Sequence, residues 1–193
     1  MHVEFLEIPA VALIQPKRFG DDRGYFVETF SARLFCERVA GAVFVQDNEA
    51  FSAQVGTLRG LHFQKPPMAQ GKLVRAVKGA IFDVAIDIRV GSPTFGKHVS
   101  ARLDAEHGAQ LWVPPGFAHG YCTLEPDTLV SYKVTNFYSP ADDGGILWND
   151  PALGIDWPYG ASGAVLSAKD TQLPLLADLA PLFTSDPARE AQR

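Results

Sequence analysis

The arrangement of apolar and polar side chains along this chain favours short β-strands over helices. Glycine and proline interrupt the sequence at short intervals, and the segments between them are rich in β-branched and aromatic residues. The clearest alternation, with a period of two, runs from Ala80 to Arg89. Its two sets are Phe82, Val84, Ile86 and Ile88 on one side and Asp83, Ala85, Asp87 and Arg89 on the other. We therefore expect a strand with one dry face and one wet face.

The sequence before this strand predicts a local pairing. Lys78 and Gly79 can form a tight reversal, so Gly71 to Val77 and Ala80 to Ile88 are expected to make a β-hairpin.

A second alternating segment runs from Leu129 to Thr135. Val130, Tyr132 and Val134 fall on one side of it, and polar residues fall on the other. The phenol of Tyr132 is therefore expected to point with the apolar side chains.

Little of the chain is predicted to be helical. Ser31 can cap a short helix from Ala32 to Ala40, and Gly41 can end it. Many short strands with turn residues between them indicate an all-β jelly roll or a related barrel. We expect one domain over residues 1–183 and a flexible C-terminal tail over residues 184–193, because that end is polar.

Composition excludes several classes of protein. The chain has 47% apolar residues and a net charge of -5, which suits a globular protein and argues against a nucleic-acid surface. No apolar run is long enough for a membrane helix and no leader pattern is present, so a cytoplasmic protein is expected. Cys36 and Cys122 lack the spacing of a zinc site or redox pair and are expected to be buried bystanders. An anionic ligand would need local cations, for which the candidates are Arg23, Arg59, Lys72 and Arg75.

Two segments combine glycine with histidine. Gly56 to Gln64 carries Arg59 and His62, and Pro114 to Gly120 carries His119. Each histidine taken alone is compatible with a purely structural role. The second segment matches the P-x-G-x-x-H element of a cupin-like barrel, for which a bound metal is the first hypothesis. However, Gln64 stands where the usual second histidine lies and no glutamate follows nearby, so the ligand set does not suit iron, manganese or zinc. We predict no metal.

Over nearly its whole length, from about Phe5 to Phe183, the chain resembles the dTDP-4-dehydrorhamnose 3,5-epimerase family. The resemblance rests on ordered motifs. They are Asp22-Arg23-Gly24-Tyr25-Phe26-Val27-Glu28, Val45-Gln46-Asp47-Asn48, Leu58-Arg59-Gly60-Leu61-His62-Phe63-Gln64, Gln70-Gly71-Lys72-Leu73-Val74, Asp83 to Arg89, Gly91 to Gly96, Gly116-Phe117-Ala118-His119-Gly120, Tyr132-Lys133-Val134-Thr135, Tyr138-Ser139-Pro140, Gly145 to Pro151 and Ser167-Ala168-Lys169-Asp170. One departure is that Glu49 and Ala50 replace the polar residue and serine common in the family.

The resemblance implies a fold, a reaction and catalytic residues. The fold would be a cupin-like jelly roll with short peripheral helices, whose N-terminal strands are exchanged in a homodimer. The reaction would invert one or two carbons beside the C4 ketone of a dTDP-linked 6-deoxy sugar, without a cofactor. His62 would be the base, Asp170 its carboxylate partner, Lys72 the cation for the developing oxyanion and Tyr132 the proton donor on the opposite face.

The remaining expected site residues would hold the substrate. Arg23 and Arg59 suit the diphosphate, because a guanidinium pairs bidentately with phosphate oxygens. Others would lie around the base, the deoxyribose and the sugar: Phe26, Glu28, Gln46, Asn48, His119 and Tyr138.

The leading hypothesis is a 3,5-epimerase acting on dTDP-4-dehydro-6-deoxy-D-glucose in the route to dTDP-L-rhamnose. Three alternatives stay open at this point. They are an epimerase that inverts only C3 or only C5, a metal-dependent cupin oxygenase or isomerase, and a non-catalytic sugar-nucleotide binding module.

Overall fold

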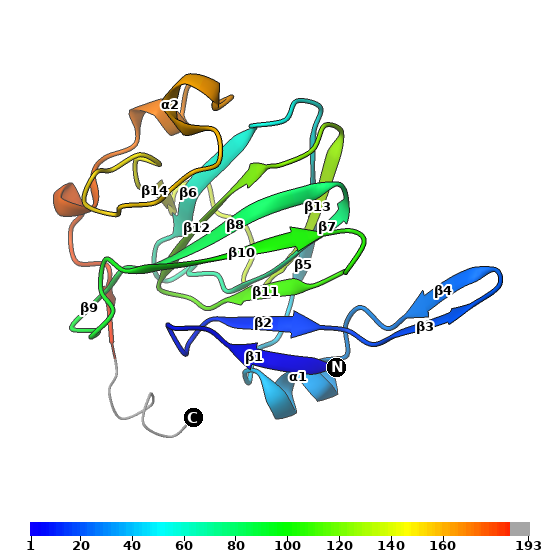
Figure 1. Cartoon of the computed structure of the whole chain (residues 1–193). Coiled ribbons are helices and arrows are strands. Elements are labelled where there is room, and N and C mark those ends of the chain that lie inside the picture. The colour runs from blue at the N-terminus through cyan, green and yellow to red at the C-terminus, as the bar shows by residue number, and fades with distance from the viewer. Residues whose placement is uncertain (186–193) are drawn as a thin grey trace.

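Two antiparallel sheets make up most of the fold in the computed structural model, which describes residues 1–185 apart from the side chain of Ala161 (Figure 1). The first sheet has the order β1 (His2–Phe5), β2 (Ala12–Gln15), β11 (Gln110–Val113), β7 (Lys72–Lys78), β13 (Thr128–Val134) and β5 (Gln46–Ser52). The second has the order β10 (His98–Asp104), β8 (Ala80–Asp87), β12 (Phe117–Thr123), β6 (Leu58–Gln64) and β14 (Asp143–Gly145). The all-β jelly-roll prediction is confirmed.

Apolar side chains from both sheets meet in the interior. Val74, Leu111 and Val130 of the first sheet pack with Ile81 and Leu103 of the second. Burial of this apolar area is the main force that holds the sheets together.

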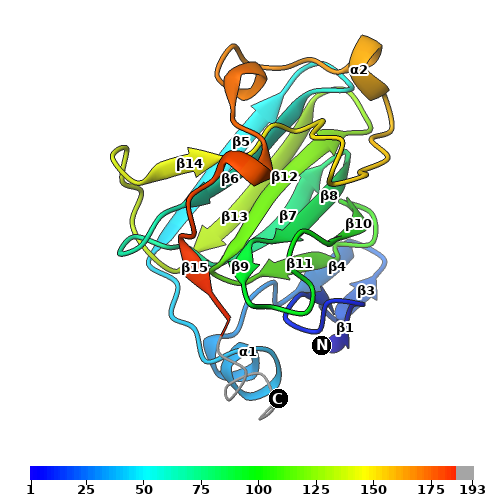
Figure 2. The ribbon, with the colours of Figure 1, turned by 90° about the vertical axis from the view of Figure 1, so that its left-hand side faces the viewer.

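The prediction that one face of the strand at Ala80 to Arg89 is wet is wrong, because both faces of β8 are buried. The set containing Val84 and Ile86 points outward, where Trp148 and Trp157 of the C-terminal segment cover it. Figure 2 shows that segment, coloured yellow to red, in front of the strands. The opposite set, with Asp83, faces the barrel interior, so its polar groups are shielded from bulk water.

The predicted hairpin between β7 and β8 is also wrong. Lys78 and Gly79 do turn the chain, and Gly79 has φ +73°. However, β7 pairs with β11 and β13, whereas β8 pairs with β10 and β12. The turn is a corner at which the chain passes from one sheet to the other, an outcome that local alternation cannot distinguish from a hairpin.

The second strand prediction and the helix prediction are confirmed. β13 spans Thr128–Val134, and Tyr132 packs with the interior apolar cluster as expected. α1 spans Ala32–Arg38, where the Ser31 hydroxyl accepts a hydrogen bond from the Leu34 amide at 3.5 Å. The helix ends before Gly41, and Phe35 anchors it in a cluster on the outside of the first sheet. The other helices are single turns: α2 (Gly160–Gly163), η1 (Asp170–Gln172) and η2 (Leu176–Asp178).

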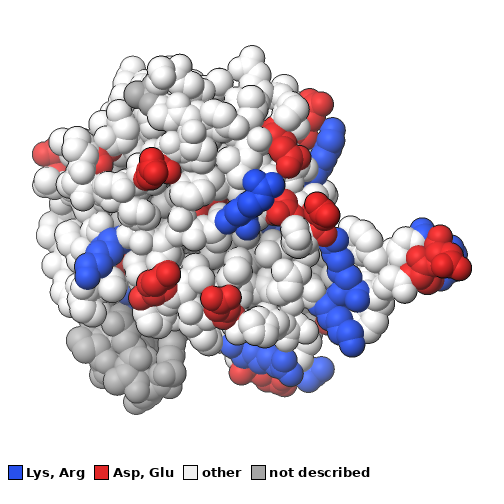
Figure 3. Space-filling view, in the orientation of Figure 1, with Lys and Arg blue, Asp and Glu red and all other residues white. Residues whose placement is uncertain are grey.

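A two-stranded ribbon near the N-terminus projects from the body of the molecule. It consists of β3 (Arg18–Asp21) and β4 (Gly24–Val27). Figure 3 shows charged side chains gathered at its tip. Its flanks carry the exposed aromatic side chains Phe19, Tyr25 and Phe26, which is unusual for a surface that faces only water.

At the C-terminal end, β15 (Phe183–Thr184) pairs in parallel with β9 (Arg89–Val90). The predicted tail lies mostly outside the described residues, which end at Ser185. Cys122 is buried as expected, but Cys36 is exposed on α1, so that part of the cysteine prediction is wrong. Within residues 1–185, no helix has the length and hydropathy needed to cross a bilayer.

A β-bulge in β6 determines which side chains of that strand face the interior. His119 of β12 lies opposite His62, but Tyr121, two residues further, lies opposite Arg59, three residues back on β6. The extra residue lets both Arg59 and His62 face inward although strict alternation would separate them. Gly60 occupies the bulge with φ +139°.

Replacing Gly60 with alanine is expected to destabilise the fold. A Cβ there would lie 2.5 Å from the Gly120 Cα, and the positive φ adds backbone strain. The combined cost is about 3 kcal/mol, which for a chain of this size lowers Tm by roughly 6–12 °C. Thermal unfolding followed by circular dichroism measures the shift. Gly41→Ala is the control, because nothing lies within 4 Å of its Cβ position; an equal change in both variants would contradict the bulge argument.

Candidate active site

A cavity of about 430 Å³ lies between the two sheets. Residues of β5, β7 and β13 line it from the first sheet, and residues of β6 and β12 line it from the second. The segment 165–170 closes another side. Six of the expected site residues line this cavity: Arg59, His62, Lys72, His119, Tyr132 and Asp170.

His62 and Asp170 form a hydrogen-bonded pair in the cavity wall. The distance from His62 Nε2 to Asp170 Oδ1 is 2.6 Å, across 108 positions of sequence. Asp170 is buried at the start of η1, and its amide donates to the Ser167 hydroxyl at 3.2 Å. Burial alone would raise the pKa of Asp170, but hydrogen bonds from His62, Ser167 and the Gly60 backbone outweigh it and hold the pKa below its usual value. Asp170 is therefore a carboxylate that fixes the ring of His62.

Lys72 projects from β7 toward His62. Its ammonium donates a hydrogen bond to the His62 carbonyl oxygen at 3.2 Å. Burial lowers the pKa of Lys72 to about 8, although the nearby carboxylates of Asp83 and Asp143 oppose that change. Lys72 is thus still mostly a cation at neutral pH, in a poorly solvated position.

His119 and Asp83 form a second imidazole–carboxylate pair, with Nε2 and Oδ1 2.7 Å apart. Both side chains are buried. Burial lowers the pKa of His119 and Asp83 only partly offsets this, so its ring is neutral near pH 7.

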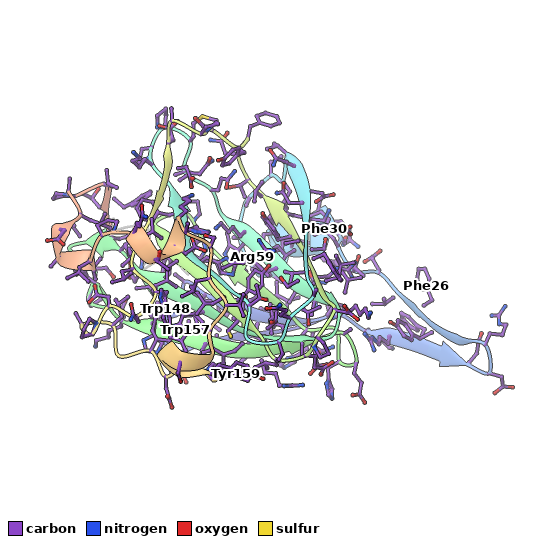
Figure 4. The ribbon with its side chains drawn as sticks, turned by 90° about the horizontal axis from the view of Figure 1, so that it is seen from above. Phe26, Phe30, Arg59, Trp148, Trp157 and Tyr159 are labelled. Atoms are coloured by element: carbon purple, nitrogen blue, oxygen red, sulfur yellow. The ribbon has the colours of Figure 1, made fainter. Side chains whose placement is uncertain are left out.

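Tyr132 and Arg59 complete the part of the cavity that was predicted. Tyr132 comes from the sheet opposite to His62, and burial raises the pKa of its phenol, which keeps its proton. The Arg59 guanidinium is anchored at the rim, where it donates to the Ser52 hydroxyl at 3.3 Å and the Phe51 carbonyl at 3.0 Å. Figure 4 shows Arg59 within the body of the molecule and Phe26 far from it on the projecting ribbon.

The other expected substrate-binding residues lie outside this cavity in the single chain. Arg23 is on the projecting ribbon, where its side chain is 89% exposed and paired with Asp21. Phe26, on the same ribbon, is 69% exposed. The remaining four are also placed elsewhere. Glu28 follows the ribbon, and Gln46 and Asn48 are hydrogen-bonded to each other on β5. Tyr138 is exposed in a loop, where its backbone amide donates a hydrogen bond to the Gln46 side chain. Arg75, a candidate cation, lines a different hollow beside Asn48.

Several cavity residues were missed by the sequence analysis. Asp83, Tyr121, Ser167 and Lys169 belong to the site or its immediate support. The alternation around Asp83 contained a signal, because a carboxylate in a buried strand needs a partner. Lys169 pairs with Asp143 of β14 and lies next to Asp170, a contact between distant segments that no local pattern predicts.

The side chains available here do not resemble a three-ligand metal site. Gln64, at the position where a cupin ligand would stand, donates to the carbonyl oxygens of Met68 and Phe137 and accepts from the Ser139 amide. Among the described residues, no three histidine, cysteine or acidic side chains form a group that could hold a metal ion. The absence of a metal stays a prediction.

Comparison with known proteins gives consistent matches. The family model described as dTDP-4-dehydrorhamnose 3,5-epimerase matches residues 5–178. A dTDP-4-dehydrorhamnose 3,5-epimerase of Sinorhizobium fredii is 58% identical over 179 residues, covering 93% of this chain and 91% of the relative. A crystal structure of dTDP-6-deoxy-D-glucose-3,5-epimerase from Legionella pneumophila, in complex with dTDP-4-keto-L-rhamnose, has a TM-score of 0.91 and 42% identity, covering 96% of this chain and 98% of that one. A dTDP-4-dehydrorhamnose 3-epimerase of Streptomyces niveus is 36% identical over 179 residues, covering 92% of this chain and 85% of the relative.

Proposed function

The chain belongs to the dTDP-4-dehydrorhamnose 3,5-epimerase family, and from that premise we propose how its cavity performs the epimerisation. The protein is a carbohydrate epimerase that acts on a dTDP-linked 4-keto-6-deoxy sugar. We propose that it inverts both C3 and C5, the two carbons beside the ketone, in the route to dTDP-L-rhamnose. The observation that carries the mechanism is the 2.6 Å bond between His62 Nε2 and the buried Asp170 carboxylate.

In this mechanism His62 removes the proton. Because the Asp170 carboxylate accepts the hydrogen bond from Nε2, the neutral ring carries its proton there and presents the lone pair of Nδ1 as the base. The carboxylate also stabilises the imidazolium that forms when Nδ1 takes the proton.

Removal of the proton leaves the electron pair of the C–H bond in a carbon–carbon double bond, with negative charge on the former ketone oxygen. Lys72 supplies the cation for that oxygen. A fixed donor in a water-poor site is worth several kcal/mol at the transition state, because it does not need to reorganise.

Inversion requires a proton to return from the other face. Tyr132 and His62 come from facing sheets and line the same cavity, an arrangement that suits donors on opposite sides of a sugar ring. The Tyr132 phenol gives its proton to the carbon, the ketone re-forms, and solvent restores the protonation of tyrosine and histidine.

The nucleotide part of the substrate needs residues that the single chain places apart. Arg59 at the rim suits the diphosphate. We propose a homodimer in which the β3–β4 ribbon of one subunit reaches the cavity of the other, so that Arg23, Phe26 and Glu28 contact the nucleotide there, with Gln46, Asn48 and Tyr138 nearby. The exposed aromatic side chains of the ribbon support this proposal. We also propose that the enzyme works in the cytoplasm without a cofactor and does not bind nucleic acid or membranes.

Turnover in D2O tests the reaction. We expect deuterium at both carbons flanking the ketone, because each inversion removes a proton and returns one from solvent. The measurement is NMR of the sugar over the time course. Absence of deuterium at either position during incubation with active enzyme would defeat the proposal.

A single-carbon epimerase remains the second candidate, because the Streptomyces niveus relative carries the name of a 3-epimerase. Deuterium confined to one carbon would favour it.

A further inference from the structure

The pair formed by His119 and Asp83 has no part in the proton transfers described above. His119 is 6% exposed on β12, and Asp83 is fully buried on β8. Burying a carboxylate carries a desolvation cost, which a hydrogen-bonded partner offsets. His119 is that partner for Asp83. The position of His119, directly opposite His62 in the strand register, puts this pair beside the proposed base.

The hydrogen bond to Asp83 determines what His119 offers to the cavity. The carboxylate accepts from Nε2, and the ring is neutral because burial lowers the pKa of His119. The single ring proton therefore lies on Nε2, and Nδ1 carries a lone pair. Within residues 1–185 no donor bonds to Nδ1, and the ring lines the cavity.

We propose that His119 accepts, through Nδ1, a hydrogen bond from a ring hydroxyl of the sugar, and that Asp83 is a positioning residue that holds His119 in the accepting tautomer. This inference rests on the proposed function and adds a determinant of substrate specificity to it.

A hydroxyl is the substrate group that fits this acceptor. The ketone oxygen and the diphosphate oxygens are themselves acceptors, and they suit the cations Lys72 and Arg59. The hydroxyls at C2 and C3 are the donors that a 4-keto-6-deoxy sugar carries on its ring near the reacting carbons. Since His119 lies next to His62, a hydroxyl bound there would place the adjacent C–H bond near the base.

The test compares ligands that differ in one hydroxyl. Unreactive dTDP-6-deoxyhexoses with a hydroxyl at C4 are prepared with the C2 or the C3 hydroxyl replaced in turn by hydrogen or fluorine. Fluorine accepts a hydrogen bond weakly but cannot donate one. We expect one of the two positions to show a loss of affinity of roughly 10- to 100-fold on either replacement, measured by titration calorimetry.

Asp83→Asn should change that preference. The asparagine amide donates to Nε2, which moves the ring proton to Nδ1 and turns the acceptor into a donor. At the same position, the hydroxyl-to-fluorine loss should shrink by about 10-fold or more, whereas a purely structural role for Asp83 would weaken all ligands equally. An unchanged preference in Asp83→Asn, or no hydroxyl preference in the unmodified enzyme, would overturn the inference.

Asp104→Asn is the matched control, because Asp104 is also a buried carboxylate paired with a histidine, the exposed His107, and this pair lies outside the cavity. It should leave the hydroxyl preference intact. Asp83 also raises the pKa of Lys72. This does not affect the comparison, because the ligands differ only at C2 or C3 and all carry the same hydroxyl at C4.

A direct measurement covers the case in which Asp83→Asn does not fold. Two-bond proton–nitrogen NMR of the unmodified, ¹⁵N-histidine-labelled protein distinguishes the two neutral tautomers, with His119 assigned by its absence in His119→Gln. We expect the Nε2–H form, and finding the Nδ1–H form would contradict the inference. Deuterium incorporation by the unmodified enzyme reports separately on the proposed function, so the two failures are distinguishable.

Discussion

Asparagine in place of His62 is expected to lower kcat by about 10³- to 10⁴-fold, the range of a lost general base. The asparagine amide cannot take a proton from carbon, and Asp170 contacts the ring of His62 at Nε2, not at Nδ1, the nitrogen proposed to face the substrate. Exchange of the sugar protons with D2O should fall by the same factor as inversion, because both depend on the same abstraction. Samples quenched at successive times and assayed for product and for deuterium at each carbon give the rate of inversion and the rate of exchange in the same experiment.

The contrast variant for this experiment is Tyr132→Phe. It keeps His62 and Asp170, so deuterium should still enter from the face of the base while inversion falls, which separates abstraction from delivery of the proton. Substrate binding in His62→Asn should change little, and calorimetry with dTDP checks that the cavity is intact. Full activity in His62→Asn would remove the histidine from the mechanism.

The positions of the strands in the sequence were easier to predict than the pairing between strands. Alternation located β8 and β13, because a period of two follows from the strand backbone alone. The pairing of β7 with β8 was predicted wrongly, because a corner between two sheets and a hairpin use the same Lys78-Gly79 turn chemistry. Only contacts distant in sequence, such as β7 with β13, decide between them.

The prediction that the Asp83 face of β8 meets water was wrong for a related reason. Alternation indicates that two faces differ, but it does not say which one meets water. Here the apolar face of β8 is covered by the C-terminal segment, and the polar face borders the cavity. In a barrel that holds a polar ligand, a strand with a charged side chain on its inner face is the expected pattern.

The candidate site was predictable only in part. Glycine and histidine motifs indicated His62 and His119, but nothing local linked Asp170 to His62, and that link came from resemblance to the family. The bulge at Gly60 also has no clear signal in the sequence, although it is what brings Arg59 and His62 to one face. The expected residues on the β3–β4 ribbon lie far from the cavity of the same chain, as they would if a second subunit completed the site.

Loss of the Lys72 charge is expected to limit the enzyme at alkaline pH. In the proposed mechanism the ammonium is the active form; it exists below its pKa, and burial lowers that pKa to about 8. A plot of kcat/KM against pH should therefore fall as the pH rises through about 8. Tyr132 does not account for this fall, because burial raises the pKa of its phenol.

Lys72→Met should lower kcat by about 10²- to 10³-fold, as expected for removal of one fixed donor to an oxyanion, and should abolish the alkaline fall of the profile. The groups that face Lys72 and shape its titration are Asp83, Asp143 and Lys169, and all three remain in the variant. Lys97→Met, at an exposed position, is the control and should keep the full profile. An alkaline limb that survives unchanged in Lys72→Met would assign it to another group and leave the oxyanion without its proposed cation.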